Sequence, residues 1–275
     1  MPQMMYNTIR CKKQYREEKR MWNDLQTGSY AGVIAETISI RGHEGKEIHA
    51  WWSRPLGGGQ HPGIVLIPHM PGWDEWCRET SFRFSSHGYS VLCPDIYQDF
   101  GFGTPTEVSG KMREAGGVHD ASVMGDTAGC LSFLRSQPQS NGKTGVIGMC
   151  SGGRHAFLAA CTVEGFDAAV DCWGGGVVMA PEQLSPARPV APIDYTEKLN
   201  IPLLGIFGNE DFSPTRADVD TLEKRLKDAG KNYEFHRYDG AGHGIWYYDK
   251  PMYRQEAAMD SWNKTLDFFD RYLKT

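Results

Sequence analysis

The sequence predicts an α/β fold with a mostly parallel central sheet, helices on both faces and an N-terminal antiparallel hairpin. Two patterns lead to this prediction. The uninterrupted apolar run at residues 63–67 is typical of a strand buried on both faces of a parallel sheet. After it, strand and helix patterns alternate along the chain, which indicates βαβ units whose helices cover the sheet.

Each further element follows from its local pattern. Alternating residues at 36–40 and 47–52 flank a turn at 42–45 and predict the hairpin. Reactive groups of such sheets gather beyond the carboxyl ends of the strands. The remaining expected elements are, in order, helix 74–88, strand 89–93, helix 119–136, strand 143–149, helix 151–162, strand 167–173, strand 202–207, helix 215–229, strand 232–237 and helix 252–272.

The length of 275 residues fits one large α/β domain or two small ones. We expect a single domain over residues 29–275, preceded by a helical extension over residues 1–28. That extension packs on the domain or on a second subunit, as in a homodimer, and a solvated flexible arm is the alternative. The proline-rich segment 174–200 either folds over the strand ends or decorates the surface.

Composition excludes several classes of partner. With 29 Lys and Arg against 34 Asp and Glu, the net charge of −5 argues against a nucleic-acid-binding surface. No apolar run approaches the ~18 residues of a membrane-spanning helix, and the N-terminus lacks the apolar core of a signal peptide. The seven cysteines show neither zinc-site spacing nor a small disulfide framework. We therefore expect a cytoplasmic protein with reduced thiols, no metal and no cofactor.

The segment Gly148-Met149-Cys150-Ser151-Gly152-Gly153 joins an expected strand to an expected helix. A sharp strand-to-helix turn with glycines two residues on either side of a nucleophile is the elbow of an α/β-hydrolase. Glycines flank Cys150 at both positions, whereas a centre at Ser151 would place the bulky Met149 in the turn. We predict Cys150 as the nucleophile; a buried structural cysteine is the alternative.

A thiol nucleophile needs a base, and the base needs an orienting group. In α/β-hydrolases the chain order is nucleophile, acid, histidine. Asp211 and His243 follow Cys150 in that order, each just past the end of an expected strand. Taken alone, Asp211 could cap the next helix, Glu210 competes with it, and His243 could be an ordinary loop histidine. Together, the order and the positions favour a triad.

The chain resembles the dienelactone hydrolase family, a cysteine-using branch of the α/β-hydrolases, from about residue 36 to the C-terminus. The resemblance implies a triad of Cys150, His243 and Asp211, and hydrolysis of a lactone or carboxylic ester through a thioester intermediate. Four segments carry it: 141–153, 91–97, 208–211 and 241–243.

The oxyanion of such a reaction needs preorganised donors. The elbow supplies the backbone N–H of Ser151 at the amino end of a helix, where the helix dipole also favours negative charge. The match to the family points to the backbone N–H of Met70 as the second donor.

Two positions depart from the family pattern. His69 stands where the family has a glutamate beside the resting cysteine, and Tyr247 stands where it has an arginine that holds a substrate carboxylate. We expect His69 to line the site and alter how the thiol is held at rest, with a structural loop histidine as the alternative. The substrate should be more aromatic or less anionic than dienelactone, with Trp73, Trp246 and Tyr247 as pocket walls or ordinary packing residues. Arg113 is a candidate cation.

Other activities fit the same residues. An acyltransferase or a C–C hydrolase would share the acyl-enzyme step on the same scaffold. A ligand-binding receptor or a redox-sensing thiol protein could be built on a retired hydrolase, but it would not need all of Cys150, Asp211 and His243. A metal-dependent hydrolase is disfavoured because the chain has no His-Glu-x-x-His pattern.

Overall fold

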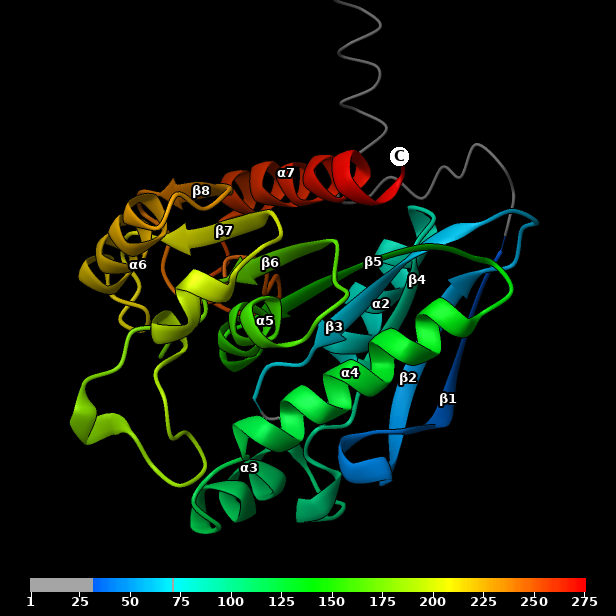
Figure 1. The fold of residues 1–275 in the computed structure, drawn as a ribbon, viewed down its shortest axis with the longest axis horizontal. Coiled ribbons are helices and arrows are strands. Elements are labelled where there is room, and N and C mark those ends of the chain that lie inside the picture. Colours follow the sequence, from blue (N-terminus) through cyan, green and yellow to red (C-terminus); the bar gives the residue numbers. More distant parts are fainter. Residues whose placement is uncertain (1–31, 71) are drawn as a thin grey trace, which may run out of the picture.

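The computed structural model describes residues 32–70 and 72–275, and its centre is one eight-stranded sheet (Figure 1). The spatial order is β1-β2-β4-β3-β5-β6-β7-β8. The pairs β1–β2 and β2–β4 are antiparallel, and the other neighbours are parallel. This is the expected α/β-hydrolase fold with its N-terminal hairpin. The strands are β1 (Val33–Arg41), β2 (Glu47–Pro55), β3 (His61–Ile67), β4 (Ser90–Pro94), β5 (Ser140–Met149), β6 (Ala168–Cys172), β7 (Leu203–Gly208) and β8 (Tyr233–Tyr238).

Helices cover both faces of the sheet (Figure 1). Side chains of successive strand residues point to opposite faces, so β3 sends Val65 and Ile67 into one core and Ile64 and Leu66 into the other. The first core contains α4, α5 and α6, and the second contains α2 and α7. The helices are α2 (Glu75–Ser86), α3 (Pro105–Glu114), α4 (Asp120–Ser136), α5 (Ser151–Thr162), α6 (Arg216–Asp228) and α7 (Gln255–Leu273). None of the described helices is both long and apolar enough to cross a membrane.

The expected elements from residue 36 onward are present with ends shifted by a few residues, and α3 is an additional helix that we did not expect. The start of α3 carries a strong local capping signal. Thr104 accepts from the backbone N–H of Glu107, the Glu107 side chain accepts from the backbone N–H of Thr104, and Pro105 is the first helical residue. The predicted extension over residues 1–28 lies outside the described residues.

The segment 174–200 lies beyond the carboxyl end of β6 and contains two short 3-10 turns, Pro181–Gln183 and Pro192–Lys198. Hydrogen bonds fasten it to the helices beside it. The Nε of Arg154 donates to the carbonyl of Gly176 at 3.0 Å, and the N–H of Asp120 donates to the carbonyl of Ala187 at 2.9 Å. The segment is therefore anchored to α4 and α5 next to the elbow.

Candidate active site

The turn from β5 into α5 holds Cys150 in a strained conformation, with φ 56° and ψ −122°. The flanking glycines are required by close approaches of the backbone. A Cβ on Gly148 would lie 2.0 Å from the carbonyl oxygen of Gly152, and one on Gly152 would lie 2.2 Å from that of Ile67. The strained residue is thus Cys150 rather than Ser151, at the centre that the glycine spacing indicates.

Asp211 and His243 meet at the same edge of the sheet. The His243 Nδ1 lies 2.9 Å from Oδ2 of Asp211, whose side chain is 0% exposed. The other oxygen of Asp211 accepts from the N–H of Ser213 at 2.9 Å. Glu210, the competing acid, instead accepts from the N–H of Gly240 at 3.1 Å. Asp211 is therefore the carboxylate that is bound to His243.

The charge on the His243 ring is set by its two neighbours. Burial favours the neutral imidazole, but hydrogen bonds with Asp211 and Cys150 outweigh it and raise the pKa of His243 to about 10. These two neighbours favour the protonated ring. With Nδ1 bound to Asp211, Nε2 is the ring nitrogen left to interact with Cys150.

The two backbone amides predicted to bind the oxyanion are those of Ser151 and Met70. Ser151 is the first residue of α5, so its N–H has no acceptor within the helix. Met70 follows β3, and the hydrogen bonds among the described residues give its N–H no main-chain acceptor. Both groups are thus available as donors to an anion.

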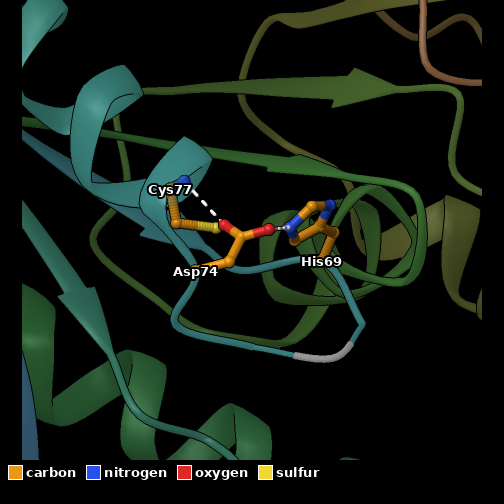
Figure 2. A group of neighbouring side chains, drawn as sticks. All are labelled: His69, Asp74 and Cys77. Atoms are coloured by element: carbon orange, nitrogen blue, oxygen red, sulfur yellow. Dashed lines mark hydrogen bonds and ion pairs between the residues drawn. The ribbon is translucent and has the colours of Figure 1, made fainter. Parts of the chain in front are cut away.

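The buried His69 and Cys77 form a cluster with the half-buried Asp74 (Figure 2). Its Nε2 is 2.7 Å from Oδ2 of Asp74, and its Nδ1 is 2.5 Å from the hydroxyl of Tyr247. Asp74 also caps α2, because its Oδ1 accepts from the N–H of Cys77 at 2.9 Å. His69 is therefore held on both sides.

The three side chains of this cluster are of types that bind metal ions, and their ligand atoms all lie within 4.8 Å of one another. The cluster could therefore hold a metal ion. Two ligands of one tetrahedral zinc lie about 3.3 Å apart when each metal–ligand bond is about 2.0–2.1 Å. The 2.7 Å between His69 Nε2 and Asp74 Oδ2 is shorter and matches a charge-assisted hydrogen bond. The geometry fits a hydrogen-bonded cluster better than a metal site.

The pocket walls that we expected do not all lie at the site. Trp246 is fully buried, with its indole N–H bound to Ser261 and its ring against Trp173, so its role as a pocket wall is corrected to core packing. Trp73 is half-buried and donates to the carbonyl of Cys93 at 3.0 Å. Arg113 is exposed, with Nη2 4.0 Å from Sδ of Met70, which places it beside the expected oxyanion turn.

Three residues near the triad were not assigned a role from the sequence. Burial raises the pKa of Tyr97 to about 12, and Ser151, Cys150 and Arg188 are the groups that modulate it, so its ring lies beside the elbow. Arg188, on the segment after β6, is half-buried, and Phe212 is 80% exposed with its ring centroid 5.8 Å from that of His243. The position of Tyr97 just past β4 could have indicated a site residue; Arg188 and Phe212 carried no such signal.

Comparisons with known proteins identify the family. The sequence profile described as "Dienelactone hydrolase family" matches residues 48–273. A protein of Methylorubrum extorquens named "Putative carboxymethylenebutenolidase" is 31% identical over 244 residues, covering 88% of this chain and 82% of the relative. A Bradyrhizobium protein named "Probable 2-oxo-3-(5-oxofuran-2-ylidene)propanoate lactonase" is 24% identical, covering 88% and 98%.

A solved structure gives the same result for the fold. The crystal structure titled "Putative Dienelactone Hydrolase" from Klebsiella pneumoniae superposes with a TM-score of 0.80 at 27% identity. The superposition covers 88% of this chain and 100% of that chain. With the family profile spanning most of the sequence, the chain belongs to the dienelactone hydrolase family.

Proposed function

We propose that the protein hydrolyses a lactone or a carboxylic ester through Cys150, with His243 as acid and base and Asp211 as the orienting carboxylate. The observation that carries the proposal is the 2.9 Å hydrogen bond between His243 Nδ1 and Asp211 Oδ2, at the edge of the sheet where the elbow lies. This bond directs Nε2 of the ring toward the nucleophile. The family supports the reaction class.

In the first half-reaction, the thiolate of Cys150 attacks the carbonyl carbon and an S–C bond forms while the carbonyl electrons move to oxygen. We assign the N–H groups of Ser151 and Met70 as the donors to this oxyanion. When the oxyanion collapses, the bond to the leaving oxygen breaks, and His243 gives its Nε2 proton to the departing alkoxide. The product is a thioester on Cys150; from a lactone, the released alcohol stays in the same molecule.

In the second half-reaction, the neutral ring of His243 takes a proton from water as the water oxygen attacks the thioester carbon. The C–S bond then breaks, Cys150 leaves as a thiolate and the carboxylic acid product departs. Asp211 stays ionised throughout and fixes the Nδ1–H of the ring. The amino end of α5, which begins directly after Cys150, favours the negative charge on sulfur.

We further propose that the preferred substrate is more aromatic or less anionic than dienelactone. A substrate carboxylate would meet the phenol of Tyr247 where the resemblance implies an arginine, and that hydroxyl is already bound to His69. Phe212 adds an exposed aromatic ring beside His243. The names of the relatives, a butenolidase and a lactonase, favour an unsaturated lactone as the reacting group.

The test compares wild type with Cys150→Ala and His243→Ala on p-nitrophenyl acetate and a panel of lactones. We expect turnover in wild type and a loss of about 10⁴-fold or more in each variant. A rapidly quenched wild-type sample should carry the acyl group on Cys150 by intact-mass and peptide analysis. The matched control is Cys161→Ala, the same change at the far end of α5, and it should retain turnover.

Two results would contradict the proposal. Wild type without turnover, but with reversible oxidation of Cys150, would indicate a thiol sensor. Acyl transfer to an added alcohol in preference to water would indicate an acyltransferase.

A further inference from the structure

A chain of hydrogen bonds connects two loops that lie on either side of the nucleophile. His69 belongs to the turn after β3, and Tyr247 belongs to the loop after β8. In the sheet, β5, which leads into Cys150, lies between these two strands. The bond between His69 Nδ1 and the Tyr247 hydroxyl, 2.5 Å long, therefore bridges the active site from one loop to the other.

The chain of hydrogen bonds is anchored at its Asp74 end by helix α2. Asp74 holds His69 Nε2 through one carboxylate oxygen and caps the start of α2 through the other (Figure 2). His69 is only 8% exposed, so both of its ring nitrogens are committed to these partners. The imidazole cannot turn without breaking a buried hydrogen bond, which is unfavourable because the freed polar groups would have no water to bind.

Charge on the residues of this chain of hydrogen bonds strengthens the bonds. Burial disfavours charge on His69, but Cys77 and Asp74 outweigh burial and raise the pKa of His69 to about 10. Burial raises the pKa of the Cys77 thiol well above its usual value, so Asp74 is the anionic partner that favours a proton on His69. In the protonated ring both N–H groups donate, to Asp74 and to the oxygen of Tyr247, and charge-assisted hydrogen bonds are about twice as strong as neutral ones.

The ring of Tyr247 is fixed independently of its hydroxyl. It packs edge-on against Trp76, with centroids 4.8 Å apart, and against Trp173 at 6.0 Å. Gly244, with φ 77°, allows this position, because a Cβ there would lie 2.3 Å from the ring. Replacing Tyr247 by phenylalanine should therefore delete the hydrogen bond and leave the ring in place.

Each end of the bridge lies next to a group that the reaction needs. His69 directly precedes Met70, and the N–H of Gly72 donates to the carbonyl of His69 at 2.6 Å, which closes the turn around Met70. Tyr247 lies four residues after His243, in a turn whose N–H at Tyr247 donates to Gly244 at 2.9 Å. The position of the Met70 amide and that of the histidine loop are thus linked through one hydrogen bond.

We propose that the Asp74–His69–Tyr247 chain fixes the turn that carries the Met70 amide against the loop that carries His243, which makes His69 and Tyr247 positioning residues of the hydrolytic site. This inference rests on the proposed function. The expected effect is large because a displacement of about 1 Å in a catalytic group can reduce the rate by about 10²-fold.

The experiment compares Tyr247→Phe with Tyr248→Phe in two assays. The first assay is kcat for p-nitrophenyl acetate, which requires an oxyanion donor; the second is alkylation of Cys150 by iodoacetamide, which forms no oxyanion. Tyr247→Phe should lower kcat by about 10- to 100-fold, change KM little and leave the alkylation rate unchanged. Tyr248→Phe removes an exposed hydroxyl that bonds Glu79 and should change neither assay.

His69→Gln gives an independent measurement, so that a loss of folding in one variant does not decide the result. It should lower kcat as Tyr247→Phe does, and the double variant should be no slower than the slower single variant, because both remove the same bond. Thermal unfolding of every variant reports whether the fold is retained.

The outcomes separate this inference from the proposed function. Wild type without ester turnover would refute the proposed function and this inference with it. Wild-type turnover with an equally fast Tyr247→Phe would refute this inference alone. A parallel fall in kcat and in alkylation would also refute it, because the chain would then act on Cys150 or His243 instead of on the Met70 turn.

Discussion

The guanidinium of Arg154 binds both carboxylate oxygens of Asp120, with Nη1 2.5 Å from Oδ1 and Nη2 2.8 Å from Oδ2. Arg154 lies four residues after Cys150 on α5, and Asp120 is the first residue of α4. The side chains are 2% and 10% exposed. Because Arg154 also donates to Gly176, this pair joins the helix of the elbow to α4 and to the segment after β6.

We predict that Arg154→Met destabilises the protein by about 3–5 kcal/mol, because it leaves the buried Asp120 carboxylate without its cation. The measurement is urea unfolding followed by circular dichroism. Arg135→Met is the matched control, since Arg135 pairs with Asp167 nearer the surface and should cost about 1 kcal/mol or less. Equal losses in the two variants would show that burial of the Arg154 pair has no special importance.

We predict that Asp211→Asn lowers kcat by about 10⁴-fold, because the amide cannot hold His243 in the same protonation state. Asp211 and Cys150 raise the pKa of His243 to about 10 against the effect of burial. Without the carboxylate the ring should lose its proton at lower pH, so the alkaline limb of the acylation rate should move to lower pH. Single-turnover acylation measured across pH tests this.

The control for this experiment is Asp239→Asn, which removes an exposed carboxylate in the loop that precedes His243. Its pH profile should match that of wild type. If Asp211→Asn also keeps the wild-type profile, another group must orient His243, and the assignment of Asp211 would be wrong.

The sheet and the triad candidates were predictable because their signals are local. The apolar run of β3 must be buried on both faces wherever it lies, and Gly148 and Gly152 are required by the turn itself. The same argument identified Cys150 as the strained residue before any contact was known. The order of Asp211 and His243 along the chain then placed them at strand ends on one edge.

The surroundings of the triad depend on contacts between distant segments, which the sequence does not show. Trp246 and Tyr247 are adjacent aromatic residues, yet the first enters the core under α7 and the second is held at the site by His69. Arg188 reaches the neighbourhood of Tyr97 only because the segment after β6 is anchored to α4 and α5. By contrast, the capping signal at Thr104 was local and could have predicted α3.

We predict that Asp171 makes the protein less stable as pH rises. Its side chain is fully buried in β6, with Oδ1 accepting from the N–H of Gly174 at 2.9 Å and Oδ2 without a partner among the described residues. Burial raises its pKa from 3.8 to about 7. Between these two values the folded state binds a proton that the unfolded state has released, so the free energy of unfolding falls as pH rises and levels off above about 7.

Asp171→Asn removes this titration. The variant should therefore have a flatter dependence of unfolding free energy on pH between about 4 and 7, with a difference in slope of at most ~1.4 kcal/mol per pH unit. Asp194→Asn, an exposed carboxylate in the turn before β7, is the control and should keep the wild-type slope. An unchanged slope in Asp171→Asn would mean that Asp171 stays ionised in the folded protein.

The last prediction concerns the charge of the substrate. Wild type should have a higher kcat/KM for a neutral aryl ester than for the same ester carrying a carboxylate, because Tyr247 provides no fixed cation. Arg113, exposed and 4.0 Å from Sδ of Met70, is then a cation beside the expected oxyanion turn that can assist the charged ester. Arg113→Gln should lower kcat/KM for the charged ester by up to about fivefold, the effect of an exposed ion pair, and leave the neutral ester unchanged. The same substitution at the exposed Arg78 of α2 should affect neither substrate. If wild type instead prefers dienelactone to neutral aromatic esters, the exchange of arginine for Tyr247 has not changed the class of substrate, and a cation from another segment must bind the carboxylate.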